Sequence, residues 1–523
     1  TLEGIKLCPD SAVFRDWERK DSLPSVYVTA EVGMIDFKGL NLTWRWSYKQ
    51  LHFDSFEIRN PDIQVFNPYY STRAEVKERK EAEIKTLYEV VSPYIKVLTV
   101  RILNLENASV SYSVENPVSP IVYALNDVSF HAYGFRLDEN SSESGKLLYC
   151  DNFDFITKRS QTLLANNDFR LQTDRILLST EDSIISISNI TLTPQGELWG
   201  EQKKRPDSYL NALIRAIEVK GIQFRRENAL NYLTARSLDI ISSDIQAFNL
   251  AGESLPSAKK TEKKSLNEAE ADSLVRSLSL YELISPVLHT VSIGTVGIGQ
   301  AKLQYSFAVK DKIEVYKLAN FDFQANDFRI DSVSETQRGF WYSRGFSFEA
   351  TGIEGLMTAR NHRFTVKRMT LDTESGDFNL ERIRLYPLSV CGQNDYMAGS
   401  IDTVGIRGLL YDKGISARLL KIDRPNLRYV LVSSFNKKDV KSVKPANSRV
   451  DVESILNPFL RYFSVKRLSL NHASVTIDDK SMSDPVTYKL NDFNFFATGI
   501  WVNRQTGKGS GLFFDYGNMG FNF

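Results

Sequence analysis

Few side chains in this sequence combine the residue types and the spacing that catalysis or metal binding requires. None of the five histidines belongs to an H-x-x-x-H or H-E-x-x-H motif; they are His52, His131, His289, His362 and His472. The three cysteines, Cys8, Cys150 and Cys391, lie far apart and include no C-x-x-C pair. The sequence also lacks the G-x-S-x-G nucleophile motif and the phosphate-binding P-loop. We therefore predict that the protein is not an enzyme and holds no metal or cofactor.

Two polar features have simpler explanations than a functional site. Gly297 and Gly299 match part of a dinucleotide-binding pattern, but the third glycine and the acidic partner are missing. Two glycines in a strand explain them better. The adjacent carboxylates of Asp478 and Asp479 come at the end of a strand-like segment, where a solvated turn accounts for them.

The pattern that recurs is apolar and has a period of two, which is typical of strands with one buried face. From position 108 to position 113, for example, apolar residues alternate with serines. We expect the apolar members of such segments to line one face of a sheet; they are Ala108, Val110, Tyr112, Ala301, Leu303, Tyr305, Phe321, Phe323, Ala473, Val475, Ile477, Phe493 and Phe495.

An apolar face of this length can be covered in different ways. A second sheet or a closed β-solenoid would bury it as an ordinary protein core. An open trough would instead need a ligand or partner over its apolar lining. Acyl chains would suit a trough because they are apolar, flexible and need no specific polar contact. The alternation by itself does not distinguish these alternatives.

These strand-like segments belong to a long repeat that occurs three times in the sequence. The first landmark is a proline, which is followed 30 residues later by a Tyr-x-Leu motif; the pairs are Pro93 and Tyr123, Pro286 and Tyr316, Pro458 and Tyr488. An aromatic cluster comes 26 residues further on, at Tyr149, Tyr342 and Phe514. A Gly-Leu or Gly-Ile pair precedes the proline, at Gly39, Gly221 and Gly408. We divide the chain into repeats over 25–200, 205–395 and 396–523, the third truncated.

Within each repeat we expect mostly strands and one short helix. Helical spacing occurs just before the proline, as at Ile84, Leu87, Tyr88 and Val91. This predicts helices near 74–92, 268–285 and 450–460, each ended or kinked by the proline. Further strands are expected at Gln50–Ile58, Phe169–Leu178, Ser183–Leu192, His362–Leu371 and Ala417–Val432.

Charge and composition narrow the class of protein. The 65 Lys and Arg residues nearly balance the 64 Asp and Glu residues, so an electrostatic case for binding nucleic acid is lacking. The chain has 31 Phe and 23 Tyr residues against 6 Met, which favours strands over helical bundles. The best candidate membrane span, Leu283–Ala301, is rich in Gly, Ser and Thr and contains a proline and a histidine. We interpret it as a helix end followed by a strand.

The repeat resembles the AsmA-like group of proteins, whose relatives include TamB and YhdP of bacteria with two membranes. The resemblance rests on the helix, on the strand residues Val465, Leu468, Leu470, Ala473 and Val475, and on the Tyr-x-Leu-Asn-Asp-Phe motif from Tyr488. The segment Leu51–Val65, with Asn60-Pro61 as a break between strands, is similar as well. The resemblance covers nearly the whole chain. It rests on the regular spacing and repetition of the motifs, since each motif alone is weak. The repeat is longer than that family would lead us to expect.

The resemblance implies an elongated, repetitive antiparallel β-sheet curled into a taco-like groove with an apolar interior. It also implies transport of phospholipid acyl chains between the inner and outer membranes, in the periplasm. Anchoring would be by an N-terminal inner-membrane helix that is not part of this sequence, and membrane proteins at the two ends would be partners. The alternative is a structural scaffold or a protein-binding module of the envelope that transports no lipid.

Overall fold

The computed structural model describes most of the chain, and the large majority of the described residues lie in β-strands. The described residues are 1–8, 27–45, 48–67, 88, 91–114, 121–141, 146–164, 169–194, 208–227, 230–249, 289–309, 312–334, 342–389, 395–411, 415–432, 462–481, 484–503 and 517–522. Backbone contacts divide the chain into two units. Unit 1 comprises Thr1–Ile245, Thr261–Gly297 and Asn326–Ser343, and unit 2 comprises Gln246–Lys260, Ile298–Ala325 and Arg344–Phe523.

Unit 1 contains the strands from β1 to β13, most of β14 and one short 3-10 helix. The bounds are β1 Leu2–Leu7, β2 Tyr27–Lys38, β3 Asn41–Arg45, β4 Tyr48–Asn67, β5 Val97–Val114, β6 Ile121–Leu137, η1 Leu147–Tyr149, β7 Asn152–Thr157, β8 Arg159–Leu164, β9 Phe169–Thr173, β10 Arg175–Ser179, β11 Ile184–Pro194, β12 Ser208–Lys220, β13 Gln223–Glu227 and β14 Leu230–Asn249.

Unit 2 contains the strands from β17 onwards, while β15 and β16 have residues in both units. The bounds are β15 Thr290–Val309, β16 Lys312–Ile330, β17 Gly345–Met357, η4 Thr358–Arg360, β18 His362–Asp372, β19 Asp377–Pro387, β20 Tyr396–Arg407, β21 Leu410–Tyr411, β22 Ile415–Asp423, β23 Asn426–Leu431, β24 Tyr462–Asp479, β25 Val486–Asn503 and β26 Asn518–Asn522.

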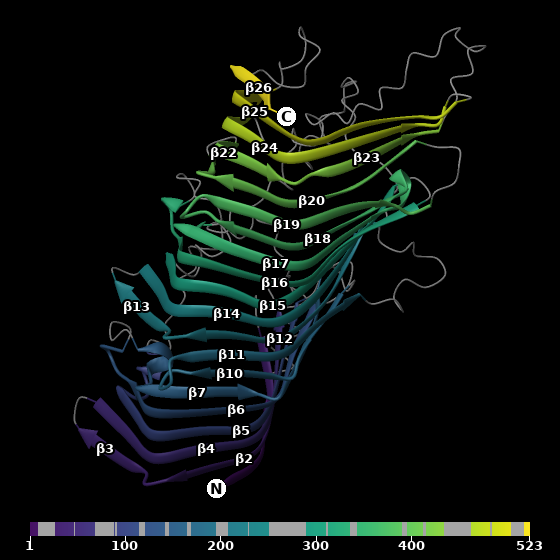
Figure 1. The fold of residues 1–523 in the computed structure, drawn as a ribbon. Coiled ribbons are helices and arrows are strands. Elements are labelled where there is room, and N and C mark those ends of the chain that lie inside the picture. Colours follow the sequence, from purple (N-terminus) through teal and green to yellow (C-terminus); the bar gives the residue numbers. More distant parts are fainter. Residues whose placement is uncertain are drawn as a thin grey trace, which may run out of the picture. The chain divides into compact units, whose positions relative to one another are not determined.

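The strands of each unit pair edge to edge into a mixed sheet (Figure 1). In unit 1, β1 pairs with β2, β2 with β4, β4 with β5 and β5 with β6. The long strand β6 then pairs with two half-length strands, β7 and β8, which continue into β10 and β9 and rejoin at β11. In unit 2, β17 to β20 follow one another, and β22 and β23 pair in tandem between β20 and β24.

Parallel pairings correct the expectation of a purely antiparallel sheet. Strand β4 is parallel to β5, and both β22 and β23 are parallel to β24, while the other strand pairs with a known register are antiparallel. Parallel neighbours cannot be joined by a tight turn and need a long crossover connection. Such connections run from Asn67 to Val97 and from Leu431 to Tyr462, the two stretches that carry the first and third predicted helices.

One helix per repeat is not borne out in the part of the chain that the structure describes. The predicted helices near 268–285 and 450–460 lie outside the described residues. Of the helix near 74–92, only its end is described: the amide of Ser92 donates to the carbonyl of Tyr88 and that of Ile95 to the carbonyl of Val91. These i to i−4 bonds are helical, and they span Pro93, which has no amide hydrogen to donate itself.

The long strands are interrupted at regular positions by a residue with positive φ. Asn107, Gln300 and His472 have φ values of 53, 55 and 50°, and each follows the landmark proline of its copy by 14 residues. Asn60 and Ser242 lie at equivalent positions after Gly39 and Gly221, with φ values of 50 and 51°. Strand β4 therefore runs without a break through Asn60-Pro61, where the sequence predicts a break between two strands. The expected strand over Phe169–Leu178, in contrast, is split at Asp174.

The positions at Asn107 and His472 are β-bulges, and each is compensated by a second shift of register on the neighbouring strand. Between β5 and β6, the register gains one residue on β5 before Ala108 and one residue on β6 after it. Strands β24 and β25 show the same double shift around Ala473. A bulge bends a strand and increases its twist. Because one extra residue on each strand restores the register, the same set of side chains stays on one face across the bend.

Candidate functional site

Apolar side chains form continuous rows across the strands of unit 1. Directly paired residues of neighbouring strands lie on the same face of a sheet. One such row, the inner row of unit 1, crosses nine strands; its members are Leu2, Ile35, Ile58, Leu105, Phe130, Phe155, Leu178, Ile185 and Val219. Beyond the bulges, the outer row of unit 1 consists of Val28, Val65, Tyr112, Tyr123, Thr162, Leu171 and Leu192.

Unit 2 has the same two rows. Its inner row crosses eight strands and consists of Ala350, Met369, Leu380, Val404, Ile422, Leu470, Phe495 and Phe521. Its outer row consists of Met397, Tyr429, Ile477 and Tyr488. In both units the paired bulges keep the inner and outer rows on one face, which we call the apolar face.

The opposite face is polar. The row next to the outer row of unit 1 contains Thr29, Gln64, Ser111, Ala124, Gln161, Gln172 and Thr191. In unit 2 a comparable row contains Thr351, Arg368, Glu381, Thr403, Asp423 and Asn471. Side chains on this face pair with one another, as where Arg368 Nε donates to Glu349 Oε1 at 2.8 Å. The two faces of each sheet therefore meet different surroundings.

The side chains of the outer rows stay at least partly exposed. No outer-row residue of either unit is buried. In unit 2, Met397, Tyr429, Ile477 and Tyr488 are 41, 39, 36 and 59% exposed. Of the two inner rows, only Ala350 is buried, and other fully buried residues gather in clusters outside these rows, such as the cluster of Ala417, Val465, Ala497 and Ile500. The outer rows therefore leave aromatic and aliphatic side chains partly accessible.

The difference in exposure between the two faces is largest at the bulges. The residue after each bulge is an alanine, and Ala108, Ala301 and Ala473 are 0, 0 and 1% exposed. The bulge residues themselves, Asn107, Gln300 and His472, are exposed. Burial of a methyl side chain next to a more accessible polar one is the pattern expected at a bend whose inner side is apolar and whose outer side meets water.

Most of the lining residues predicted from the sequence can be placed by register. Val110 and Tyr112 pair with Leu125 and Tyr123, and Val475 and Ile477 pair with Leu490 and Tyr488. Ala473 pairs with Phe493, and Leu470 with Phe495. All of these lie on the apolar faces, together with Ala108. Their role as lipid-lining residues stays a prediction.

The remaining predicted residues belong to β15 and β16. The rings of Phe321 and Phe323 lie 5.9 and 5.7 Å from those of Phe348 and Phe346, next to the inner row of unit 2. Tyr305 is 39% exposed and stacks on Phe307, with ring centroids 5.4 Å apart. Ala301 is buried at its bulge and Leu303 is half-buried.

The apolar residues of β17 to β20 were not predicted from the sequence. Phe364, Leu385, Ile401 and Met397 extend the apolar face but are not among the predicted lining residues. The sequence does contain a signal for part of this stretch, because the alternation in His362–Leu371 predicts a strand there. The predicted lining residues stand at equivalent offsets in the three copies, and these strands lie outside those offsets.

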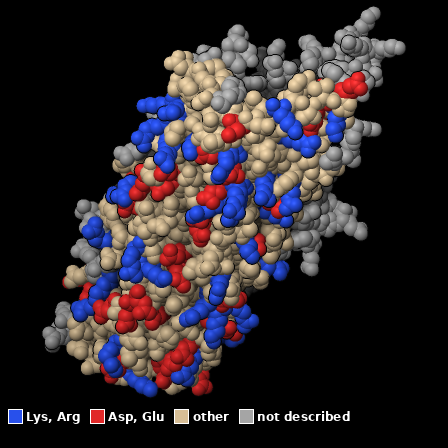
Figure 2. Space-filling view, in the orientation of Figure 1, with Lys and Arg blue, Asp and Glu red and all other residues tan. Residues whose placement is uncertain are grey.

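Within the described ranges, no three His, Cys, Asp or Glu side chains come together in a way that could hold a metal ion. Acidic and basic side chains are interspersed on the face shown in Figure 2, without a large area of one sign. No helix among the described residues is long and apolar enough to cross a membrane.

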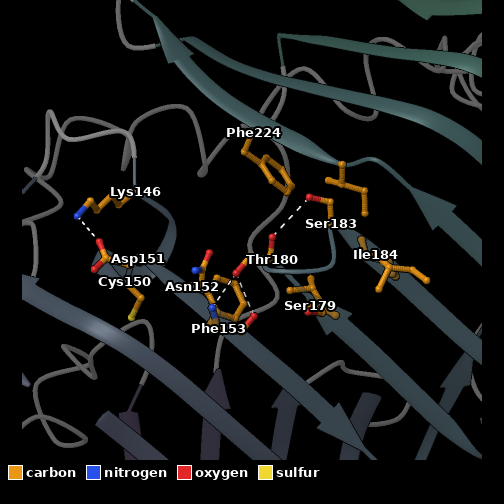
Figure 3. Close-up of a pocket in the computed structure, with 13 residues that line it drawn as sticks. Lys146, Cys150, Asp151, Asn152, Phe153, Ser179, Thr180, Ser183, Ile184 and Phe224 are labelled. Carbon is orange, nitrogen blue, oxygen red and sulfur yellow. Dashed lines mark hydrogen bonds and ion pairs between the residues drawn. The ribbon is translucent and has the colours of Figure 1, made fainter. Parts of the chain in front are cut away.

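A pocket opens at one end of the apolar face of unit 1 (Figure 3). Its volume is about 230 Å³. Apolar side chains make up much of its wall; they are Phe153, Leu178, Ile184, Ile185, Ile222 and Phe224. Phe153 belongs to a buried cluster with Ala132 and Cys150, and Leu178 and Ile185 are members of the inner row. The pocket therefore adjoins the apolar face through Phe153, Leu178 and Ile185, while Ile184, which pairs with Ser179 and Lys220, belongs to the opposite face.

Comparisons with known proteins do not identify the chain. No family model matches it, and no curated protein matches it either. A crystal structure of the sex pheromone staph-cAM373 precursor is matched over 60% of this chain and 81% of that chain, at 9% sequence identity and a TM-score of 0.11. A similarity this weak supports no conclusion about fold or function. The resemblance to AsmA-like proteins is not tested by these comparisons and stays a prediction.

Proposed function

We propose that the apolar faces bind the acyl chains of phospholipids and that the protein is a passive lipid carrier of the cell envelope. The observation that carries the proposal is the outer rows: aromatic and aliphatic side chains in register across neighbouring strands, none of them buried by a described part of the chain. A large exposed apolar surface marks a binding site for a ligand, a partner or a membrane.

The proposed shape of the binding site is a taco-like groove. Bulges at equivalent positions of neighbouring strands would bend a sheet along one line. The buried alanines Ala108 and Ala473 favour a bend with the apolar face on its inner side, because only small side chains fit there. Acyl chains would lie along the inner side while head groups stay in solvent at the open edge.

Passive transport fits a face without specific polar contacts. Each methylene moved from water to an apolar surface contributes roughly 0.8 kcal/mol, so a chain can be held by area alone. Rows of the same kind recur in both units, so each unit offers a lipid a site of similar character. From the resemblance to AsmA-like proteins, we place this activity in the periplasm, between the inner and outer membranes, with membrane proteins at the ends as partners.

Native mass spectrometry of the purified chain, with lipid extraction, tests the proposal. We expect several phospholipids per chain. We expect Tyr112→Asp to reduce their number, because an acyl chain that covers the new carboxylate would remove it from water at a cost in free energy. Ser111→Asp is the matched control, since Ser111 is the neighbouring residue on the polar face. Circular dichroism would establish that both variants are folded.

A lipid-free mass from a stably folded chain would contradict the proposal. It would favour the alternative of a structural scaffold or a protein-binding module of the envelope. Equal lipid loss in Tyr112→Asp and Ser111→Asp would also contradict it, because the two residues lie on opposite faces.

A further inference from the structure

We propose that the pocket in unit 1 binds the methyl end of an acyl chain, and so gives unit 1 one defined binding site. This inference rests on the proposed function and narrows it. The lining residues all belong to unit 1, between Lys146 and Phe224. They come from the ends of β7, β10 and β11, from the start of β13 and from the segment before β7.

The inside of the pocket offers a guest no polar group in need of a partner. Thr180 Oγ1 accepts from the amide of Phe153 at 2.7 Å and donates to the carbonyl of the same residue at 3.1 Å. The thiol of Cys150 donates to the carbonyl of Leu148 at 3.2 Å. Among the described residues that line the pocket, none has a buried side-chain oxygen or nitrogen without a partner. An apolar guest therefore leaves no hydrogen bond unmade.

Apart from Lys146 and Asp151, the residues that line the pocket are uncharged. Burial, together with the nearby carboxylate of Asp151, raises the pKa of the Cys150 thiol to about 11, so the thiol stays neutral near pH 7. The charges are at the rim, where the ammonium of Lys146 pairs with the carboxylate of Asp151 (Figure 3). Both side chains are largely exposed, and the pair carries no net charge. The pocket would thus select its guest by the apolar end and not by the head group.

Its size fits part of one acyl chain. A volume of about 230 Å³ accommodates roughly eight groups of water or methylene size, at about 30 Å³ each. The remainder of a longer chain would lie along the inner row, beginning at Leu178 and Ile185. A branched or ring-shaped guest would use the same volume but would not continue along the row.

Unit 2 supplies an internal comparison. The contact between threonine and backbone recurs there, since the amide of Phe346 donates to Thr373 Oγ1 at 2.8 Å. The equivalent of Ile184, however, is Asp377, counted at the same offset of 193 residues that separates Pro93 from Pro286. A carboxylate in place of an isoleucine makes this position of unit 2 unsuitable for a hydrocarbon. The lining at this position therefore differs between the two units.

Photolabelling of the full chain tests the inference. The probe is a twelve-carbon fatty acid with a diazirine near its methyl end, and a phosphatidylcholine with the same group on one acyl chain is used in parallel. After irradiation and digestion, we expect both probes to label peptides that contain Phe153, Leu178 or Phe224. Labelling by the fatty acid but not by the phosphatidylcholine would still support the pocket and would identify a free acid as its guest.

A matched pair of variants locates the label. Phe224→Asp places a charge on a residue that is 39% exposed, and we expect it to reduce labelling in the pocket about tenfold. Leu213→Asp changes a residue that is 51% exposed and pairs with Thr191 of the polar row, and labelling should persist. Label on the apolar faces but not in the pocket would overturn this inference and leave the proposed function standing. No label on a folded chain would overturn both.

A chain-length series on the unchanged protein does not depend on any variant. Calorimetric titration with fatty acids of six to fourteen carbons should show affinity rising about fourfold per methylene, with a smaller increment once roughly eight carbons fill the pocket. An increment that stays uniform over the whole series would contradict a pocket of limited depth.

Discussion

At the residue scale, two turns with the same sequence pattern illustrate how the repeat stabilises its strand ends. Strands β6 and β16 both end in an Arg-x-Asp segment followed by a turn that includes a serine. The carboxylate of Asp331 accepts hydrogen bonds from Ser334 Oγ at 2.6 Å, from the amide of Ser334 at 2.8 Å and from Arg329 Nε at 2.6 Å. These bonds, the Ser334 hydroxyl first, lower the pKa of Asp331 to about 2.

We expect Asp331→Asn to lower the free energy of unfolding by about 1–3 kcal/mol at neutral pH, because hydrogen bonds to a charged group are lost. The folded-state pKa of about 2 lies below the ordinary 3.8, so the ionised carboxylate stabilises the fold above 3.8. That stabilisation is lost as the pH falls through 2. Denaturant titrations from about pH 5 downwards should therefore show the two proteins converging.

The exposed residue Asp484 provides the control. Its replacement by asparagine should leave the free energy of unfolding unchanged across the same range. A difference between wild type and Asp331→Asn that persists undiminished near pH 2 would show that the carboxylate's charge is not the source of the stabilisation.

At the scale of single elements, the bulges decide how a strand of up to 20 residues can bend and still pair on both sides. The bulge position takes Asn, Gln or His in the three copies, at φ values that most residues with side chains avoid. Asn and His are among the residues that adopt this region more often, whereas β-branched residues rarely do. The backbone conformation, and not a shared side chain, is what the copies have in common here.

Asn107 tests this conclusion. We expect Asn107→Val to lower the free energy of unfolding by about 1–2 kcal/mol, because a β-branched residue resists positive φ. Asn107→Gly should cost a few tenths of that amount or less, since glycine adopts the conformation freely. Urea denaturation measures both. Equal losses for valine and glycine would show that the Asn107 side chain matters and not its backbone conformation.

Elements also differ in how well they could be predicted. The alternation in His362–Leu371 predicted β18 to within one residue, because a half-buried strand exposes every second side chain. The pairing of β6 with two half-length strands, β7 and β8, could not be predicted. It depends on a break at Lys158 that meets the bulge at Asp127 in the neighbouring strand.

At the scale of the whole molecule, a lipid that binds only the folded state should stabilise the chain. A ligand that binds only the folded state raises the free energy of unfolding by about 2.7 kcal/mol when its concentration is a hundred times the Kd. We therefore expect a short-chain phosphatidylcholine, added below its micelle concentration, to raise the melting temperature. The variant Tyr112→Asp/Tyr429→Asp, with one charge on each outer row, should respond much less.

The matched control carries Ser111→Asp in place of the outer-row changes, and its response should equal that of wild type. A melting temperature that does not move with added lipid, in a chain that unfolds cooperatively, would count against lipid binding by either unit. An equal rise in all three proteins would indicate an effect of the lipid that does not involve the apolar faces.

The sequence by itself determined that the chain is built of strands with one apolar and one polar face, and that three stretches repeat. Both follow from local information: alternation has a period of two residues, and repeated landmarks keep their spacing. Residues such as Val110, Tyr112, Val475 and Ile477 could therefore be assigned to one face from the alternation alone.

Only the tertiary structure decided which strands are neighbours, which of them are parallel and where the rows of apolar side chains align. The inner row of unit 1 joins Leu2 to Val219 through nine strands, and no local pattern specifies those pairings. Register is set by contacts between segments far apart in the chain, and a shift of one residue would move every apolar side chain to the other face. The compensating bulges around Ala108 and Ala473 prevent that shift.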